Sequence, residues 1–278
     1  MHPILFKIHL PEFLQGFMPE TVTVYSYGFL IMVGAIISMT YTSIQAKRRL
    51  DVSFDTSQSI FLIIFIGAFL GGKVFYFFEN PSYFMENPSE LWGSRGFVFY
   101  GSLIFSVTGI LVFFKLQKLP ILKMLDIIAF TTAIVHLFGR MGCFMAGCCY
   151  GIPTNSNYGV VFRDPDSMAR PLETHLHPTQ LYSVLLLIII LATLFILRNS
   201  QRFDGQLFLS YLMIYSVGRS IIEIFRGDLS RGYIIDNWLS HSQFISLIIL
   251  SFSVFFYFKL SKKTSKLSKK ASGKSVIT

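Results

Sequence analysis

Seven long apolar runs are the feature of this sequence that most limits what the chain can fold into. A helix of about 20 apolar residues crosses a bilayer. Because lipid offers the backbone no hydrogen bonds, such segments must be helices. We predict spans at residues 24–44, 57–78, 97–115, 124–144, 180–197, 206–224 and 242–259. The sequence therefore predicts an all-α integral membrane protein of about seven transmembrane helices.

The composition of the chain and the positions of its prolines suggest one membrane domain with two short flanking segments. Charged residues make up only 14% of the chain, well below the roughly 25% of soluble proteins. Residues 1–23, interrupted by Pro3 and Pro11, are expected to form an interfacial segment. Residues 24–259 form the predicted membrane domain, and the Lys/Ser-rich residues 260–278 are expected to be a disordered cytoplasmic tail.

The positive charges predict the orientation. If the first span runs inward, the inner segments and the tail carry 15 of the 24 Lys and Arg residues, and the outer segments carry six. Three more lie within the spans. Because cytoplasmic loops are enriched in Lys and Arg, we expect the N-terminus outside and the C-terminus inside. The net charge of +9 thus reflects topology and anionic lipid rather than a nucleic-acid partner.

Ionisable side chains inside the spans are candidate functional residues, because each is costly in lipid unless it is paired or hydrated. With the predicted topology, six side chains fall near the outer face and suggest one polar cavity there: Tyr27, Lys73, Tyr100, Arg140, Arg219 and Glu223. Two other interpretations remain open. Long cationic side chains can extend to the interface, and residues four apart, as in Arg219 and Glu223, can form a purely structural pair.

All three cysteines fall within the segment GRMGCFMAGCCYG, at the outer end of the fourth span. Cys143, Cys148 and Cys149 can be inert small residues at a helix end, can form a disulfide in an oxidising compartment, or can be reactive or metal-binding thiols. None of the nearby histidines has a spacing typical of a metal site, so we expect no metal. His136 is expected to hydrogen-bond to a neighbouring helix.

Nine segments together resemble the bacterial prolipoprotein diacylglyceryl transferase family, from about Tyr25 to Leu250. They occur in the order of that family: YGFLIMVG at Tyr27, FLGGKVFY at Phe69, FVFYGSLI at Phe97, LDIIA at Leu125, GRMGCFMAGCCYG at Gly139, HPTQLY at His177, FDGQLF at Phe203, YSVGRSIIEIFRGD at Tyr215 and SQFISL at Ser242.

The resemblance implies a multi-pass enzyme of the bacterial cytoplasmic (inner) membrane, acting at the outer leaflet. Its reaction would transfer diacylglycerol from phosphatidylglycerol to the thiol of the lipobox cysteine in a prolipoprotein. The product is a thioether, glycerol phosphate leaves, and no cofactor is implied. Cationic side chains would bind the lipid phosphate and stabilise it as it leaves.

The resemblance carries over residue by residue for part of the site. Arg140 matches the arginine of the family's GR segment, and Tyr27 matches the first-helix tyrosine. His177 and Gln180 match the HPxQLY segment, which is expected to position the active-site loop. The sixth-helix set of the family is matched by Tyr215, Arg219, Glu223 and Arg226.

Four positions depart from the family pattern. Tyr100 replaces a histidine that is a candidate proton acceptor, and tyrosine is a poor base near neutral pH. Cys143 and Cys148 replace an asparagine and a glutamate, and Lys73 replaces a more usual arginine. We expect Arg140, Arg219, Glu223, Tyr100, Cys143 and Cys148 to be catalytic, and Tyr27, Lys73, His177, Gln180, Tyr215 and Arg226 to bind substrate.

The departures leave three alternatives to the family reaction. The chain can be a divergent paralogue with another acceptor or a thiol-linked intermediate. It can be a lipid-binding or lipid-transport protein that retains the fold without catalysis. It can also be a membrane thiol redox protein that uses Cys143 with Cys148 or Cys149.

Overall fold

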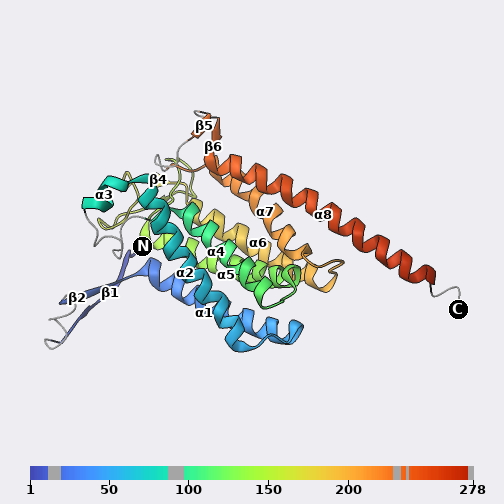
Figure 1. The fold of residues 1–278 in the computed structure, drawn as a ribbon. Coiled ribbons are helices and arrows are strands. Elements are labelled where there is room, and N and C mark those ends of the chain that lie inside the picture. Colours follow the sequence, from blue (N-terminus) through green and yellow to red (C-terminus); the bar gives the residue numbers. More distant parts are fainter. Residues whose placement is uncertain (12–19, 87–96, 228–232, 236–237, 275–278) are drawn as a thin grey trace. The chain divides into compact units, whose positions relative to one another are not determined.

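Long helices dominate the computed structural model, which describes residues 1–11, 20–86, 97–227, 233–235 and 238–274 (Figure 1). A helix occurs at each of the seven predicted spans. The helices are α1 (Ser26–Leu50), α2 (Phe54–Glu79), α4 (Phe99–Leu116), α5 (Ile121–Ala146), α6 (Thr179–Asn199), α7 (Gln206–Glu223) and α8 (His241–Lys274), with a short α3 (Pro81–Glu86).

The strands form three small two-stranded antiparallel sheets. They are β1 (Ile4–His9) with β2 (Thr21–Tyr25), β3 (Val160–Val161) with β4 (His175–Leu176), and β5 (Tyr233–Ile235) with β6 (Leu239–Ser240). The first sheet places a β-ribbon in the segment that we expected to be interfacial, of which residues 12–19 lie outside the described part. Alternating Val and Thr in β2 suit a strand.

Five helices, α1, α2, α5, α6 and α8, are long and apolar enough to cross a membrane. The fourth helix contributes a shorter apolar stretch, Tyr100–Leu116. Helix α7 has 18 residues but is less apolar, because Gln206, Arg219 and Glu223 are among them. The fold class predicted from the sequence is therefore confirmed: this is an all-α membrane protein.

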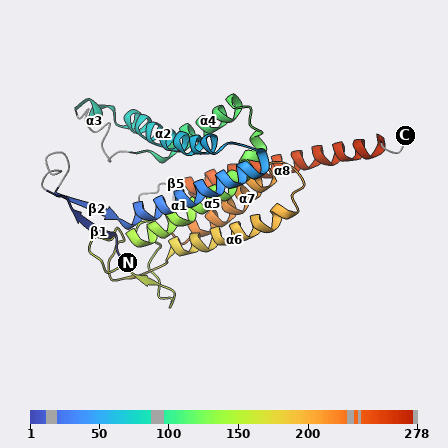
Figure 2. The same cartoon turned by 90° about the horizontal axis from the view of Figure 1, so that it is seen from below.

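The chain divides into two compact units. One comprises Met1–Ser38 with Ile128–Thr278, and the other comprises Met39–Ile127. In the second unit α2 and α4 pack side by side (Figure 2).

Glycines let the backbones of α2 and α4 approach closely. A Cβ on Gly71 would collide with the carbonyl oxygen of Gly101, and a Cβ on Gly67 would come within 2.9 Å of Ser106 Cα. The hydroxyl of Ser102 donates across the interface to the Ala68 carbonyl at 2.7 Å. These small residues therefore allow close helix packing.

In the first unit, α7 packs against both α6 and α8. Gly218 of α7 lies against Leu186 of α6. Gln206 donates to the hydroxyl of Tyr257 on α8 at 3.1 Å. These contacts hold α7, which is not among the helices apolar enough to cross a membrane, between α6 and α8 and thereby position its polar end.

The beginning of α1 packs against the second half of α5. A Cβ on Gly34 would come within 2.7 Å of Phe138 Cβ. The Ser38 hydroxyl donates to the Thr131 carbonyl at 3.2 Å. This packing brings Tyr27, at the start of α1, against Gly142 near the end of α5.

The C-terminal segment differs from the expected disordered tail, because α8 continues to Lys274. Lys, Ser and Ala residues after Lys259 lower the hydropathy, but Lys and Ala are good helix formers, so the helix is able to continue beyond the apolar stretch. Residues 275–278 lie outside the described part of the chain.

Candidate functional site

The end of α7 carries a buried group of charges. Arg219 forms an ion pair with Glu223, one helical turn later. Arg226 Nη1 lies 3.9 Å from the same carboxylate oxygen of Glu223. The carboxylate side chain is only 3% exposed, and those of Arg219 and Arg226 are 11% and 12% exposed. The pairing predicted from the spacing of four residues is confirmed.

A third arginine approaches this group from α5. Arg140 Nε donates to His136 Nε2 at 3.3 Å. The Tyr215 hydroxyl of α7 lies 3.4 Å from the same nitrogen. Arg140, Tyr215 and Arg219 also interact electrostatically with one another. The predicted hydrogen bond from His136 to a neighbouring helix is therefore confirmed, and it links α5 to α7.

The three cysteines converge where α5 ends. The Sγ atoms of Cys143, Cys148 and Cys149 all lie within 4.8 Å of one another. All three are free thiols, and Cys143 is 9% exposed. The Cys148 thiol donates to the Cys143 carbonyl at 3.8 Å. These residues could together hold a metal ion that prefers sulfur ligands.

The backbone after α5 turns back sharply and so brings the thiols together. Gly147, just past the helix end, has φ +79°, the left-handed conformation that commonly ends a helix. Cys149 has φ +57°, which is unusual for a residue with a side chain. The start of α6 holds this turn: Gln180 donates to the Cys148 carbonyl at 2.7 Å, and Thr179 donates to the Cys149 carbonyl at 2.6 Å.

A second set of backbone bonds fixes the segment that follows the cysteines. Gly151 N donates to the His177 carbonyl at 2.9 Å, and Gly227 N donates to the Tyr150 carbonyl at 3.1 Å. A Cβ on Gly151 would come within 2.5 Å of His177 Cβ, so the close approach needs glycine. The His177 imidazole itself hydrogen-bonds Tyr182 at 3.0 Å. His177 and Gln180 thus support the cysteine turn.

Electrostatic contacts join the arginines to the thiols. Arg140 interacts with Cys143 and Cys149, and Arg226 interacts with Cys149. Hydrogen bonds from the thiols of Cys143 and Cys148, together with the two guanidinium charges, hold the pKa of the Cys149 thiol below its ordinary value. Tyr27 at the start of α1 interacts with all three cysteines and with Arg140. The first unit thus contains one continuous polar site.

Lys73 and Tyr100, two more of the residues expected in the site, belong to the second unit. Lys73 is 4% exposed, and its Nζ lies 4.7 Å from the centre of the Phe97 ring, a cation–π distance. Tyr100 is 46% exposed, near the start of α4. Lys73 is thus buried against an aromatic ring, whereas Tyr100 presents its side chain at the surface of its unit.

The structure adds three residues that the expected set of site residues omitted. His136 holds Arg140, Cys149 completes the group of thiols, and Thr179 anchors the turn. His136 sits four residues before Arg140, a spacing that places both on one helix face, so this pair had a signal in the sequence. Cys149 was one of the three clustered cysteines, and Thr179 lies within the HPTQLY segment, but neither had a feature that singled it out.

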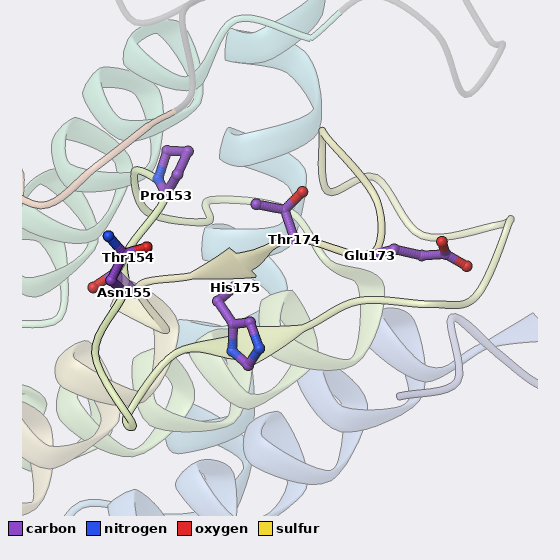
Figure 3. A pocket seen from close by; sticks show the side chains of 6 residues that line it. All are labelled: Pro153, Thr154, Asn155, Glu173, Thr174 and His175. Carbon is purple, nitrogen blue, oxygen red and sulfur yellow. The ribbon is translucent and has the colours of Figure 1, made fainter.

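A separate cavity of about 460 Å³ lies in the connection between α5 and α6. Figure 3 shows the six side chains that line it: Pro153, Thr154, Asn155, Glu173, Thr174 and His175. Nδ1 of the His175 ring lies 3.4 Å from the Gly159 carbonyl oxygen. None of the arginines or cysteines of the polar site lines this cavity.

The fold and the site define a class: a polytopic membrane protein with a buried arginine-rich site next to three free thiols. The family model for prolipoprotein diacylglyceryl transferase matches residues 17–259. The chain belongs to this family.

Relatives with assigned names support the same assignment. The phosphatidylglycerol–prolipoprotein diacylglyceryl transferase of Clostridium tetani is 35% identical over 260 residues, which cover 92% of this chain and 97% of that protein. The Clostridium perfringens protein named phosphatidylglycerol–prolipoprotein diacylglyceryl transferase 2 is 34% identical, covering 84% and 90%. The Rickettsia bellii transferase is 32% identical, covering 93% and 95%.

Proposed function

We propose that this protein transfers the diacylglyceryl group of phosphatidylglycerol to the thiol of a lipobox cysteine in prolipoproteins. The observation that carries the proposal is the buried pairing of Arg219 and Arg226 with one carboxylate. Arg140 and the thiol of Cys149, which lies beside the other two thiols, are within electrostatic reach of these arginines. Membership of the transferase family and the names of the relatives support it.

The arginine group suits the phosphate of the donor lipid. Three guanidinium groups and the Glu223 carboxylate together carry two more positive charges than negative ones. A buried excess of positive charge attracts an anion, and guanidinium groups bind phosphate oxygens through two parallel hydrogen bonds. In the reaction the carbon–oxygen bond to this phosphate breaks, and glycerol phosphate leaves with the electron pair. Arginines that are already in position before the reaction would stabilise the negative charge that develops on the leaving phosphate.

The acceptor sulfur forms the new bond. A carbon–sulfur bond is made to the glyceryl carbon as the phosphate leaves, and the thiol proton must go to a base or to water. Thiolate, not thiol, is the nucleophile. The positive charge of the site favours the thiolate, so the same arginines serve both substrates.

The proposed site faces the outer side of the bacterial cytoplasmic membrane. Helix α1 ends in Lys47, Arg48 and Arg49, which the positive-inside tendency places in the cytoplasm. The opposite end of α1, with Tyr27, would then lie at the outer face together with the arginine group. The N-terminus would be outside, and α8 would lead its basic end into the cytoplasm.

Transfer of a labelled diacylglyceryl group provides the test. Purified protein in phosphatidylglycerol-containing micelles is incubated with a lipobox peptide, and with the same peptide carrying serine in place of cysteine. We expect lipidation of the cysteine peptide only. Arg140→Ala should lower the rate by about 100-fold, as expected for loss of a donor to a developing anion. Arg163→Ala, which removes an exposed arginine, is the matched control and should retain the parental rate.

Absence of transfer by the parent protein, with phosphatidylglycerol still bound and the fold intact, would contradict the proposal. It would favour a different acceptor or a lipid-binding protein without catalysis. If Arg140→Ala and Arg163→Ala lowered the transfer rate equally, Arg140 would have no special role.

A further inference from the structure

We propose that Cys143, Cys148 and Cys149 bind a zinc ion and that the open fourth position of this ion takes the acceptor thiol. The second half of this inference rests on the proposed function, whereas the metal site itself does not. It goes beyond the sequence, from which we expected no metal.

The geometry of the three sulfur atoms is the first argument. Thiolates bind zinc at about 2.3 Å, so three of them on one ion lie about 3.8–4.0 Å apart. The Sγ atoms of the three cysteines already lie within 4.8 Å of one another. Movements of under about 1 Å, within the reach of χ1 rotation, would bring them onto one ion.

The support of the cysteine turn is the second argument. Cys149 keeps a left-handed backbone, φ +57°, a strained conformation that persists only where the surroundings hold it. Thr179 and Gln180 bind the carbonyls of Cys149 and Cys148. Ser167 closes the turn from the other side, because its hydroxyl fills the space that a Cβ on Gly147 would need. Metal sites depend on such outer contacts to orient their ligands.

The charge balance is the third argument. Zinc with three thiolates carries one net negative charge, and a fourth thiolate would make it two. Arg140 and Arg226 lie within electrostatic reach of Cys149, and Arg140 also acts on Cys143. Two positive charges therefore face the group that would become negative. Without ionised sulfur, the same two cations would have fewer counter-charges in this buried site.

Three protein ligands would leave one coordination position of the zinc ion open. Among the described residues, no histidine, aspartate or glutamate joins the three thiols as a fourth donor. Zinc bound by three protein ligands keeps a fourth position for water or substrate, and a thiol that binds there loses its proton. The metal would thus generate the acceptor thiolate, a role for which Tyr100 is a poor base.

In the proposed step, a carbon–sulfur bond forms as the carbon–oxygen bond to the phosphate breaks. Loading zinc releases to solvent the protons that the cysteine thiols still carry. The acceptor thiol displaces water from zinc and releases its own proton. Its sulfur then attacks the glyceryl carbon, the carbon–oxygen bond breaks, and glycerol phosphate leaves as an anion. The product is a thioether, a neutral and weak ligand, which leaves zinc so that water returns.

Metal binding is tested on the purified full-length protein without any substrate. Zinc content after dialysis against zinc sulfate is measured by mass spectrometry, and we expect about one zinc per chain. Cys148→Ser and Cys149→Ser should retain less than about a tenth of this amount. Thr193→Ala, at a half-buried position in the second half of α6, is the control and should retain all of it.

A second readout needs no cysteine variant. Ellman's reagent should modify the three thiols of chelator-treated protein and should react far more slowly with zinc-loaded protein. With Co²⁺ in place of zinc, sulfur-to-metal charge-transfer bands should appear. Addition of the cysteine lipobox peptide should shift the cobalt visible bands, and the serine peptide should not.

The outcomes separate the two proposals. If zinc binds but no lipid is transferred, the metal site stands and the proposed function fails. If protein freed of zinc transfers lipid at the parental rate, the role of the metal in the reaction is refuted. If zinc is absent, or is held equally by the serine variants, or if copper(I) alone is retained, the zinc site itself is refuted.

Discussion

Neutralising Glu223 gives a sharp test of the buried charges on α7. Its carboxylate is 3% exposed and serves two arginines, Arg219 and Arg226, which are themselves nearly buried. Glu223→Gln keeps the shape of the side chain but removes its charge. Arg219 and Arg226, seven residues apart, then remain in a poorly hydrated site without their shared counter-charge.

The expected cost follows from this geometry. Leaving one partner of a buried ion pair uncompensated costs about 3–5 kcal/mol. A destabilisation of 1 kcal/mol lowers the melting temperature of a chain of this size by about 2–4 °C. Glu223→Gln should therefore lower the Tm by about 6–20 °C in neutral detergent.

Thermal unfolding in two micelle compositions provides the assay. Phosphatidylglycerol should raise the Tm of Glu223→Gln more than that of the parent, because the lipid phosphate supplies the missing negative charge. Glu20→Gln, at an exposed glutamate, is the matched control and should unfold with the parent. A Tm of Glu223→Gln within about 2 °C of the parent, or an equal response of the two proteins to the lipid, would refute the reasoning.

Three further predictions concern packing, phosphate binding and thiol chemistry. Gly71→Val should destabilise the α2–α4 contact by about 1–3 kcal/mol, because its side chain meets Gly101; Gly28→Ala, where no atom lies within 4 Å, should not lower the Tm. Arg140→Lys keeps the charge but loses the planar fork, so steady-state kinetics should show a kcat/KM about tenfold or more below the parent, and an unchanged value would count against phosphate contact. In zinc-free protein, the lowered pKa of Cys149 should make its iodoacetamide labelling rise less between pH 7 and pH 9 than that of an ordinary thiol with a pKa of about 8.5, as read by peptide mass spectrometry; a rise of about tenfold or more, as for an ordinary thiol, would contradict this.

Local patterns in the sequence were sufficient for several parts of the structure. The seven helices follow from apolar runs of bilayer length, because lipid forces such runs to satisfy their own hydrogen bonds. The pair of Arg219 and Glu223 follows from a spacing of one helical turn. Small residues repeated on one face of α2, such as Gly67 and Gly71, permit close helix packing, and the structure shows that α4 is the partner. Each of these depends on neighbours in the sequence.

The site itself was decided by tertiary structure. Cys143, Cys148 and Cys149 were open to three interpretations until the turn after α5 was seen to bring their sulfur atoms within 4.8 Å of one another. That turn depends on Thr179 and Gln180, about thirty residues further along the chain. The β1–β2 ribbon was likewise not expected from the sequence.

The difference has a physical cause. Hydropathy and helical spacing express the cost of exposing polar groups to lipid, and this cost is set residue by residue along the chain. The position of Arg140 instead depends on its hydrogen bond to His136. The Tyr215 hydroxyl of another helix contacts the same His136 nitrogen across 79 residues, and no periodic pattern encodes that contact. The sequence by itself therefore determined the membrane helices and the family, whereas only the packing of α1, α5, α6 and α7 decided which charges and thiols meet.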